Sequence, residues 1–246
     1  MMELMATCFE CDSFCEHEMS VFKEPDDRPQ LFFSKQPNDI RYVRRIFLRD
    51  ENLFLIHMQR DPRSVITSEH DSRPGMYFCN FLVWQACYSA ARQLGGHPRF
   101  LLIRYEDLTS DPDRVQRVIK ERFPFLTMRH PFSQYQDHAN PSRDASAAMS
   151  GLRPISTNRR RNWEAHLPRV KAQLQRHPEL GRVLVESGYE SDLSWMRILD
   201  AVEAQDYPCR YPSTPRPWKK WETRVRKYFQ SQAYLSRHGL RSKLDA

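Results

Sequence analysis

An arginine and a serine, Arg60 and Ser68, frame a short segment whose residue types suit the binding of an anion. The segment follows an apolar run, Leu53 to Ile56, that is typical of a strand buried on both faces. Asp61 can accept hydrogen bonds from the free N–H groups of a starting helix, and Pro62 fits its first turn, where no N–H is needed. We therefore predict a strand, a tight turn and a helix from about Pro62 onward, with Arg60 at the end of the strand and Ser68 on the helix.

This placement gives the two side chains a chemical use. In an open α/β sheet, ligands bind at the carboxyl ends of the strands, and a helix N-terminus there favours phosphate. Arg60 offers a charged fork and Ser68 a hydroxyl to the same anion. The alternative is an ordinary strand-to-helix turn with a solvated arginine, because Arg and Asp-Pro are common in such turns.

Residues 60–68, Arg-Asp-Pro-Arg-Ser-Val-Ile-Thr-Ser, resemble the 3′-phosphate-binding segment of sulfotransferases that use 3′-phosphoadenosine 5′-phosphosulfate (PAPS). In that family an Arg opens the segment, a Pro follows two residues later, and a Ser closes it eight residues after the Arg. All three positions match here. The resemblance implies that Arg60 and Ser68 bind the 3′-phosphate of PAPS.

A second candidate strand, Leu31 to Phe33, is followed by Lys35 and Pro37 and then by a predicted helix from about Ile40 to Leu48. This segment is similar to the Lys-x-Pro element at the end of a core strand in the same family. The resemblance implies that Lys35 lies near the transferring sulfuryl group. The alternative is a solvated lysine at the start of a loop.

A third candidate strand, Phe100 to Ile103, leads into Tyr105-Glu106-Asp107-Leu108, and Asp111-Pro112 starts the next amphipathic helix. The four residues resemble the family's Tyr-Glu-Asp-Leu segment, which implies that Tyr105 contacts the adenine-bearing nucleotide. Three strand-to-helix units with charged residues at one edge predict a parallel sheet between two layers of helices. The fold class is thus a three-layer α/β/α fold, like that of P-loop nucleoside-triphosphate hydrolases.

A late basic segment extends the resemblance. Arg159, Arg160 and Arg161 precede Trp163 and a predicted helix from Glu164 to Arg176. Many family members have a basic loop that ends in Arg/Lys-Trp and closes over the 3′-phosphate. The glycines that some branches use are absent here, so the sequence does not choose among the three arginines. A solvated basic helix start is the alternative for each of them.

The general base is the least determined of the predicted site residues. Some family branches use a His two residues after the strand-end Lys, but that position is Pro37 here, which excludes this mechanism. Other branches use a Glu between the first helix and the second strand. Glu16 and Glu18 both lie in that region; we prefer Glu16, and His17 stays open as an alternative.

One family motif has no counterpart in the sequence. Members carry near their N-terminus a loop with Gly, Lys or Arg, and Ser-Gly-Thr that binds the 5′-phosphosulfate, whereas the seven glycines of this chain begin at Gly75. The apolar spacing of Met1 to about Phe14 predicts a helix, with no strand before it. We therefore expect the natural protein to begin upstream of Met1, which makes the fold incomplete at its N-terminus. A degenerate, non-catalytic domain is the alternative.

Composition sets the remaining expectations. The 246 residues predict one sulfotransferase-like α/β domain, 1–195, followed by a Pro-containing linker and a basic amphipathic tail, 196–246. The whole chain has a net charge of +7, and residues 210–246 alone have a net charge of +8, so residues 1–209 have a net charge of −1. A nearly neutral body with a basic tail argues against a dedicated nucleic-acid-binding domain. No transmembrane run and no secretory signal is found, and six cysteines in this length favour a reducing, cytoplasmic setting.

The tail contains a candidate helix from Trp218 to Leu235. Its larger apolar residues can share one helical face: Trp218, Trp221, Val225, Tyr228 and Phe229. Such a helix can dock on the domain, lie on an anionic membrane or contact a partner, and we favour docking.

These observations lead to three hypotheses. The first is a sulfotransferase that moves a sulfuryl group from PAPS to a hydroxyl or amine, with an acceptor that the sequence does not identify. The second is a degenerate domain that binds nucleotide or a partner without catalysis, and the third is a nucleic-acid or anionic-surface binder acting through the basic tail. No metal is expected, because Cys8, Cys11 and Cys15 share one face of the predicted helix and lack a second Cys-x-x-Cys pair.

Overall fold

The computed structural model describes residues 1–16, 18–23, 25, 27, 29–69, 73, 75–141, 146, 152, 154–157, 160–211 and 217–240. The chain divides into two units, and each is described by itself. Unit 1 comprises Met1–Met58, Ala90–Ser156 and Trp221–Ala246, and unit 2 comprises Gln59–Ser89 and Thr157–Lys220.

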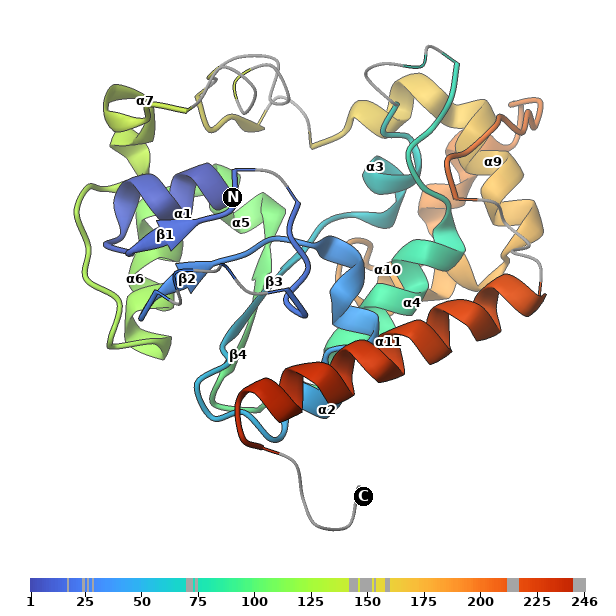
Figure 1. The fold of residues 1–246 in the computed structure, drawn as a ribbon. Coiled ribbons are helices and arrows are strands. Elements are labelled where there is room, and N and C mark those ends of the chain that lie inside the picture. The colour runs from blue at the N-terminus through green and yellow to red at the C-terminus, as the bar shows by residue number, and fades with distance from the viewer. Residues whose placement is uncertain are drawn as a thin grey trace. The chain divides into compact units, whose positions relative to one another are not determined.

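The described strands of the chain form two short pairs (Figure 1). In the first pair, β1 (Ser13–Phe14) runs parallel to β2 (Phe32–Phe33). In the second pair, β3 (Leu55–Gln59) lies beside β4 (Phe100–Arg104). The N–H of Leu55 donates to the carbonyl of Arg99 at 2.9 Å, which joins the starts of the two strands, so they too run parallel.

The three strands predicted from the apolar runs are therefore present, and the chain is a mixed α/β protein with small parallel sheets. Some boundaries move: β2 omits Leu31, β3 starts at Leu55 rather than Leu53 and continues to Gln59, and β4 continues to Arg104. A single sheet between two helical layers stays a prediction.

The first helix is shorter than its apolar spacing predicts. Helix α1 covers Met2–Cys8, and Phe9 is already extended, with φ −122° and ψ 152°. The N–H of Glu10 donates to the carbonyl of Thr127 at 2.9 Å, and Asp12 Oδ2 accepts from the N–H of Leu31 at 2.8 Å. The prediction of a helix to Phe14 was wrong, because these distant partners draw the chain into β1.

The other helices of unit 1 follow the sequence more closely. Asp111 caps α6 by accepting from the N–H of Arg114 at 2.9 Å, as predicted. The predicted helix from Ile40 to Leu48 is instead divided between a 3₁₀ turn, η1, and the short helix α2. The described elements are η1 (Pro37–Arg41), α2 (Arg44–Phe47), α5 (Tyr105–Ser110), α6 (Pro112–Arg122), η2 (Phe132–Gln134), α7 (Tyr135–His138) and α11 (Pro217–Arg237, whose first four residues belong to unit 2).

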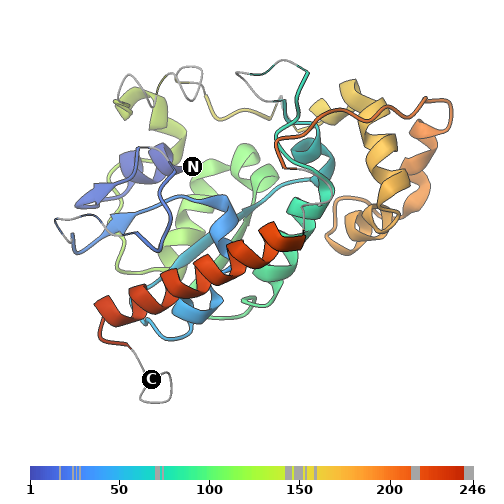
Figure 2. The same ribbon diagram turned by 45° about the vertical axis from the view of Figure 1, so that its right-hand side comes forward.

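Helix α11 docks on unit 1 beside α2, as both Figure 1 and Figure 2 show. Leu235 and Tyr234 are buried in a core that includes Val43 and Phe47. Lys227 Nζ lies 2.7 Å from Asp39 Oδ1, which fixes the same face of the helix. Docking was the favoured interpretation, but the aromatic residues that share a face in the sequence are not the ones that dock: Trp218, Trp221, Tyr228 and Phe229 are exposed.

Unit 2 consists of helices and 3₁₀ turns around its own core. Its elements are α3 (Pro62–Ile66), α4 (Phe81–Arg92, whose last three residues belong to unit 1), η4 (Asn162–His166), α9 (Leu167–Arg176), α10 (Glu179–Glu186) and η5 (Leu193–Leu199). Ile66, Phe81 and Trp84 pack with Leu180 and Leu184 in the core of this unit.

The starts of two helices in unit 2 follow from nearby hydrogen bonds and from a 3₁₀ turn. Helix α4 begins at Phe81, because the N–H of Tyr77 donates to the carbonyl of Pro208 at 2.9 Å and Asn80 Oδ1 accepts from the N–H of Val83 at 3.1 Å. The predicted helix from Glu164 begins as η4, and regular helix starts at Leu167. Within the described part of the chain, no helix combines the length and apolarity needed to cross a membrane.

Candidate functional site

The turn between β3 and α3 has the form that the sequence predicts. Strand β3 ends at Gln59, so Arg60 follows it directly, and Asp61 Oδ1 accepts from the N–H of Arg63 at 2.8 Å to cap α3. Pro62 occupies the first turn of the helix. Arg60 is half-buried, and its carbonyl accepts from Trp84 Nε1 at 3.0 Å. The backbone that carries Arg60 is thus held from both sides of the turn.

Arg63, which the sequence does not single out, has a buried side chain with several strong contacts in this turn. Its side chain is only 3% exposed and contacts Asp61 at 2.7 Å and Glu190 at 2.5 Å. The guanidinium carbon also lies 4.1 Å from the ring centroid of Trp163 and 4.8 Å from that of Trp195. Two carboxylates and two indole rings therefore enclose one cation.

Arg63 and Ser64 connect the turn to the late basic segment within unit 2. Ser64 Oγ donates to the carbonyl of Arg160 at 2.9 Å, and Trp163 stacks on Arg63. Arg160 is half-buried, while Arg161 is exposed and forms an ion pair with Glu164. Two segments that the sequence assigns to one phosphate, 60–68 and 160–163, are therefore bonded to each other; Arg159 lies outside the described residues.

Ser68 is the predicted site residue whose placement changes most. Helix α3 ends at Ile66, and Ser68 follows its cap, with its N–H donating to the carbonyl of Val65 at 3.2 Å. The prediction that Ser68 lies on the helix was wrong. Thr67 Oγ1 donates to the carbonyl of Arg63 at 2.7 Å, and the carbonyl of Ser68 accepts from the N–H of Phe78 at 2.8 Å, which directs the chain out of the helix. The Ser68 side chain is exposed.

The remaining candidates belong to unit 1. Tyr105 follows β4 directly and begins α5, so it stands at a strand end as predicted. Lys35 follows β2 by two residues; its N–H donates to Cys15 Sγ at 3.2 Å and its carbonyl accepts from the N–H of Met19 at 3.0 Å. Its side chain is exposed, as is that of Glu16.

Lys35 and Glu16 both act electrostatically on a third residue, Glu3 of α1, which the sequence does not single out. Burial raises the pKa of the Glu3 carboxyl, the charge of Glu16 raises it further, and the charge of Lys35 opposes the rise. Glu3 is 8% exposed, and its Oε1 atom is buried with no hydrogen-bond partner among the residues that the structure describes. The candidate lysine and the candidate base thus lie within charge–charge range of one buried acid.

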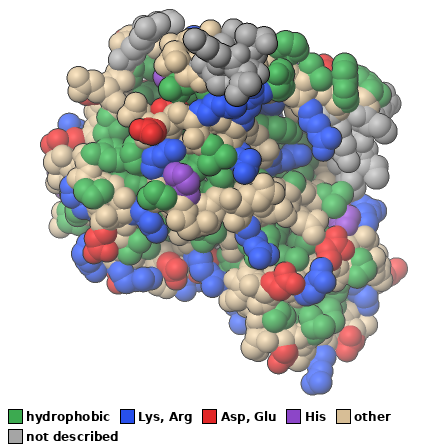
Figure 3. All heavy atoms as spheres, turned by 90° about the horizontal axis from the view of Figure 1, so that it is seen from below, with side chains coloured by type: hydrophobic (Ala, Val, Ile, Leu, Met, Phe, Trp, Pro, Cys, Tyr) green, Lys and Arg blue, Asp and Glu red, His purple; other side chains and the backbone are tan. Residues whose placement is uncertain are grey.

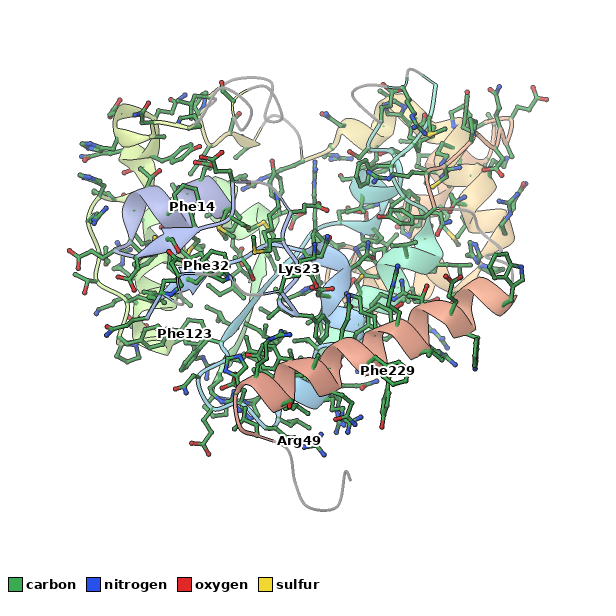
Figure 4. The ribbon with its side chains drawn as sticks, viewed as in Figure 1. Phe14, Lys23, Phe32, Arg49, Phe123 and Phe229 are labelled. Carbon is green, nitrogen blue, oxygen red and sulfur yellow. The ribbon has the colours of Figure 1, made fainter. Side chains whose placement is uncertain are left out.

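Glu16 also borders a depression of about 310 Å³ in unit 1. Its lining combines both signs of charge with an aromatic ring: Ala6, Cys11, Asp12, Ser13, Phe14, Glu16 and Arg129. Phe14 comes from β1 and is labelled in Figure 4 beside Phe32 of the paired strand. The space next to Glu16 is therefore large enough for a small polar group.

Glu3→Gln is expected to stabilise the protein at neutral pH by roughly 1 kcal/mol, or a rise in Tm of about 2–4 °C. Because the folded-state pKa of Glu3 is raised above the ordinary value of a glutamate, the stability linked to Glu3 is fully present below that ordinary value and is lost as the pH rises through the raised pKa. Thermal unfolding at pH 4 and pH 7 checks this: the two proteins should differ at pH 7 and converge near pH 4. Glu10→Gln, at an exposed position, is the control, and a Glu3→Gln protein less stable than wild type at pH 7 would contradict the prediction.

Comparisons with known proteins add a distant structural likeness. No protein-family model matches the chain, and no curated protein is significantly similar to it. Among solved structures, 55% of the chain is similar to 51% of the sulfotransferase domain from the Synechococcus PCC 7002 olefin synthase, with 23% sequence identity and a TM-score of 0.39. The match thus spans about half of that domain, and membership of a family stays a prediction from the motifs.

Proposed function

We propose that this chain carries a sulfotransferase site that binds the PAPS nucleotide and moves its sulfuryl group to a hydroxyl or amine acceptor. The observation that carries the proposal is the Ser64–Arg160 hydrogen bond, together with the stacking of Arg63 on Trp163. These contacts hold the two segments that resemble the family's 3′-phosphate site against each other. The proposal includes the three-layer α/β/α fold that the motif order predicts.

The residues of unit 2 suit a phosphate chemically. Arg60, Arg160 and Arg161 bring three positive charges to the joined segments, and phosphate is bound well by planar guanidinium groups. Arg60 and Ser68 are assigned to the 3′-phosphate, with the basic segment 159–161 as a further source of charge. Tyr105 of unit 1 is assigned to the adenine-bearing nucleotide.

Sulfuryl transfer sets two further requirements. The acceptor oxygen or nitrogen bonds to sulfur while the bond from sulfur to the phosphate oxygen breaks, so negative charge develops on that oxygen and a proton leaves the acceptor. We assign to the Lys35 ammonium the stabilisation of this developing negative charge. The Glu16 carboxylate is assigned to the proton, and the depression beside it is the proposed place of a small polar acceptor group.

A non-catalytic nucleotide-binding domain is the alternative, because the sequence lacks the Gly-containing loop for the 5′-phosphosulfate. Such a domain would bind adenosine 3′,5′-bisphosphate but would transfer no sulfuryl group. Binding and transfer therefore have to be measured separately.

Arg60→Ala is expected to remove most of the thermal stabilisation that adenosine 3′,5′-bisphosphate gives the wild-type protein. Loss of one charge-assisted phosphate contact should weaken binding by about 2–3 kcal/mol, or roughly 30- to 150-fold. Titration of the nucleotide with thermal unfolding as the readout measures the change, and Ser68→Ala should give a smaller loss in the same direction.

Arg182→Ala is the matched control for this titration, since Arg182 belongs to the same unit, is 74% exposed and pairs with Glu186 of its own helix. It should respond to the nucleotide like wild type. If Arg60→Ala and wild type are stabilised equally, the assignment of the 3′-phosphate to Arg60 is wrong.

A further inference from the structure

A second basic site lies in unit 1, outside the residues assigned to sulfuryl transfer. A depression of about 560 Å³ lies along η1 and α2, and four of its lining residues are arginines. The lining contains no carboxylate: Arg41, Tyr42, Arg44, Arg45, Leu48 and Arg49. Four like charges around one depression produce a positive potential that favours anionic groups.

The outward face of α11 continues this site with aromatic side chains. Trp221 is 69% exposed, Phe229 65% and Tyr228 50%, and the Arg45 guanidinium carbon lies 4.7 Å from the centroid of the Tyr228 ring. Leu48, 46% exposed, adds an aliphatic side chain from α2. Figure 4 shows Phe229 pointing away from the ribbon, and Figure 3 shows basic, acidic and hydrophobic side chains interspersed over the face that it draws.

The aromatic side chains are not exposed because α11 is poorly docked, since the opposite face of the helix already packs on unit 1. Lys227 pairs with Asp39, Tyr234 donates to Asp50, and Arg237 Nη2 donates to the carbonyl of Phe22 at 2.8 Å. The aromatic face therefore contributes nothing to these bonds. Large aromatic side chains that are exposed to solvent in this way indicate a surface that binds another molecule or a membrane.

We propose that α2 and the outward face of α11 form a docking surface for an anionic phospholipid bilayer. The arginines would lie at the level of the lipid phosphates, and Trp221, Phe229 and Leu48 would enter the boundary between headgroups and acyl chains. Exposed charge on this surface is mainly positive, since Arg224 and Arg226 of α11 add to the four arginines of the depression, against Glu222 of the same helix.

A nucleic acid fits these observations less well. Proteins that bind single strands place aromatic rings inside a charged groove that follows the backbone, where bases stack on them. Here the rings stand on the outside of a helix, and Leu48 is aliphatic and offers no ring for stacking. A lipid surface accepts both kinds of side chain at once. The inference is independent of the proposed sulfotransferase activity.

The test is sedimentation of the full chain with vesicles of two compositions. The protein should bind vesicles of phosphatidylcholine with about one third phosphatidylglycerol, bind much more weakly to pure phosphatidylcholine, and be released as salt rises. Arg41→Gln combined with Arg44→Gln should weaken binding roughly 30-fold, because each arginine near an anionic surface contributes about a factor of five. Arg117→Gln combined with Arg122→Gln, two exposed positions on α6, is the charge-matched control and should bind like wild type.

A second variant tests the aromatic side chains separately. Trp221→Ser combined with Phe229→Ser should weaken vesicle binding by about tenfold or more at low salt, since two interfacial rings are lost. Brominated lipids should quench the tryptophan fluorescence of wild type more than that of Trp221→Phe. Circular dichroism checks that each variant is folded; if the serine variant is not, the arginine pair and the Trp221→Phe comparison still decide.

Three outcomes would overturn the inference. The first is no binding to the phosphatidylglycerol vesicles at low salt. The second is equal vesicle binding by the Arg41/Arg44 variant and the Arg117/Arg122 control. The third is binding to single-stranded RNA that depends on the same residues while the vesicles stay unbound, which would assign the surface to nucleic acid.

Discussion

Arg63→Met is expected to lower the free energy of unfolding by about 3 kcal/mol, near the lower end of the range for breaking a buried ion pair. The substitution keeps most of the side-chain volume but leaves Asp61 and Glu190 without their shared cation. Glu190 is partly exposed and can gain water, which limits the loss. Urea unfolding followed by tryptophan fluorescence measures the effect, since the rings of Trp163 and Trp195 flank the guanidinium.

A combined variant separates the ion pair from the packing around it. Arg63→Met with Asp61→Asn and Glu190→Gln removes all three charges, and Asn at position 61 can still cap α3. Removing a whole buried ionic group costs much less than breaking it, so this variant should recover most of the lost stability. Arg182→Met, at an exposed position of the same unit, should change stability by less than about 0.5 kcal/mol. A loss for Arg63→Met no larger than that of Arg182→Met would refute the role of Arg63.

The same variant also bears on the candidate site. Arg63 contacts Trp163, and Ser64 next to it bonds the carbonyl of Arg160, so α3 and the basic segment are held by neighbouring residues. We expect Arg63→Met to weaken the response to adenosine 3′,5′-bisphosphate as well as to lower stability. Arg60→Ala leaves the Arg63 ion pairs with Asp61 and Glu190 in place, so its main effect should be on the response to the nucleotide.

Local chemistry explains which parts of the fold could be predicted from the sequence. Asp61-Pro62 and Asp111-Pro112 both start helices as predicted, because a cap and a first-turn proline act within four residues. Short apolar runs located β2, β3 and β4 to within two or three residues. Each of these features depends only on residues that are close together in the sequence, so the sequence alone is enough to predict it.

Features that depend on distant partners could not be predicted. Arg63 looked like any turn arginine, since Glu190 and Trp195 lie more than 120 residues away in the chain. Helix α1 ends early because Glu10 bonds Thr127, and Ser68 leaves α3 because of a bond to Phe78. The raised pKa of Glu3 could not be predicted for the same reason, because its neighbours in sequence do not indicate that Glu16 and Lys35 act on it.

The second large effect concerns catalysis. Lys35→Ala is expected to lower sulfuryl transfer from labelled PAPS by about 10²–10³-fold, the usual loss when one group that stabilises developing charge is removed. The substitution should leave the fold intact, because the Lys35 side chain is exposed and the hydrogen bonds to Cys15 and Met19 use the backbone of Lys35. Binding of adenosine 3′,5′-bisphosphate should therefore persist, and a loss of transfer with retained binding would be a loss of chemistry.

Lys23→Ala provides the matched control, since Lys23 is an exposed lysine of the same unit, labelled in Figure 4, with no assigned role in transfer. Lys35→Arg keeps the positive charge but moves it, and should retain part of the activity. If Lys35→Ala turns over like the Lys23 control, Lys35 has no catalytic role. If wild type itself transfers no sulfuryl group yet binds the nucleotide through Arg60, the non-catalytic alternative holds, because the phosphate site would then exist without the chemistry that Lys35 and Glu16 are proposed to supply.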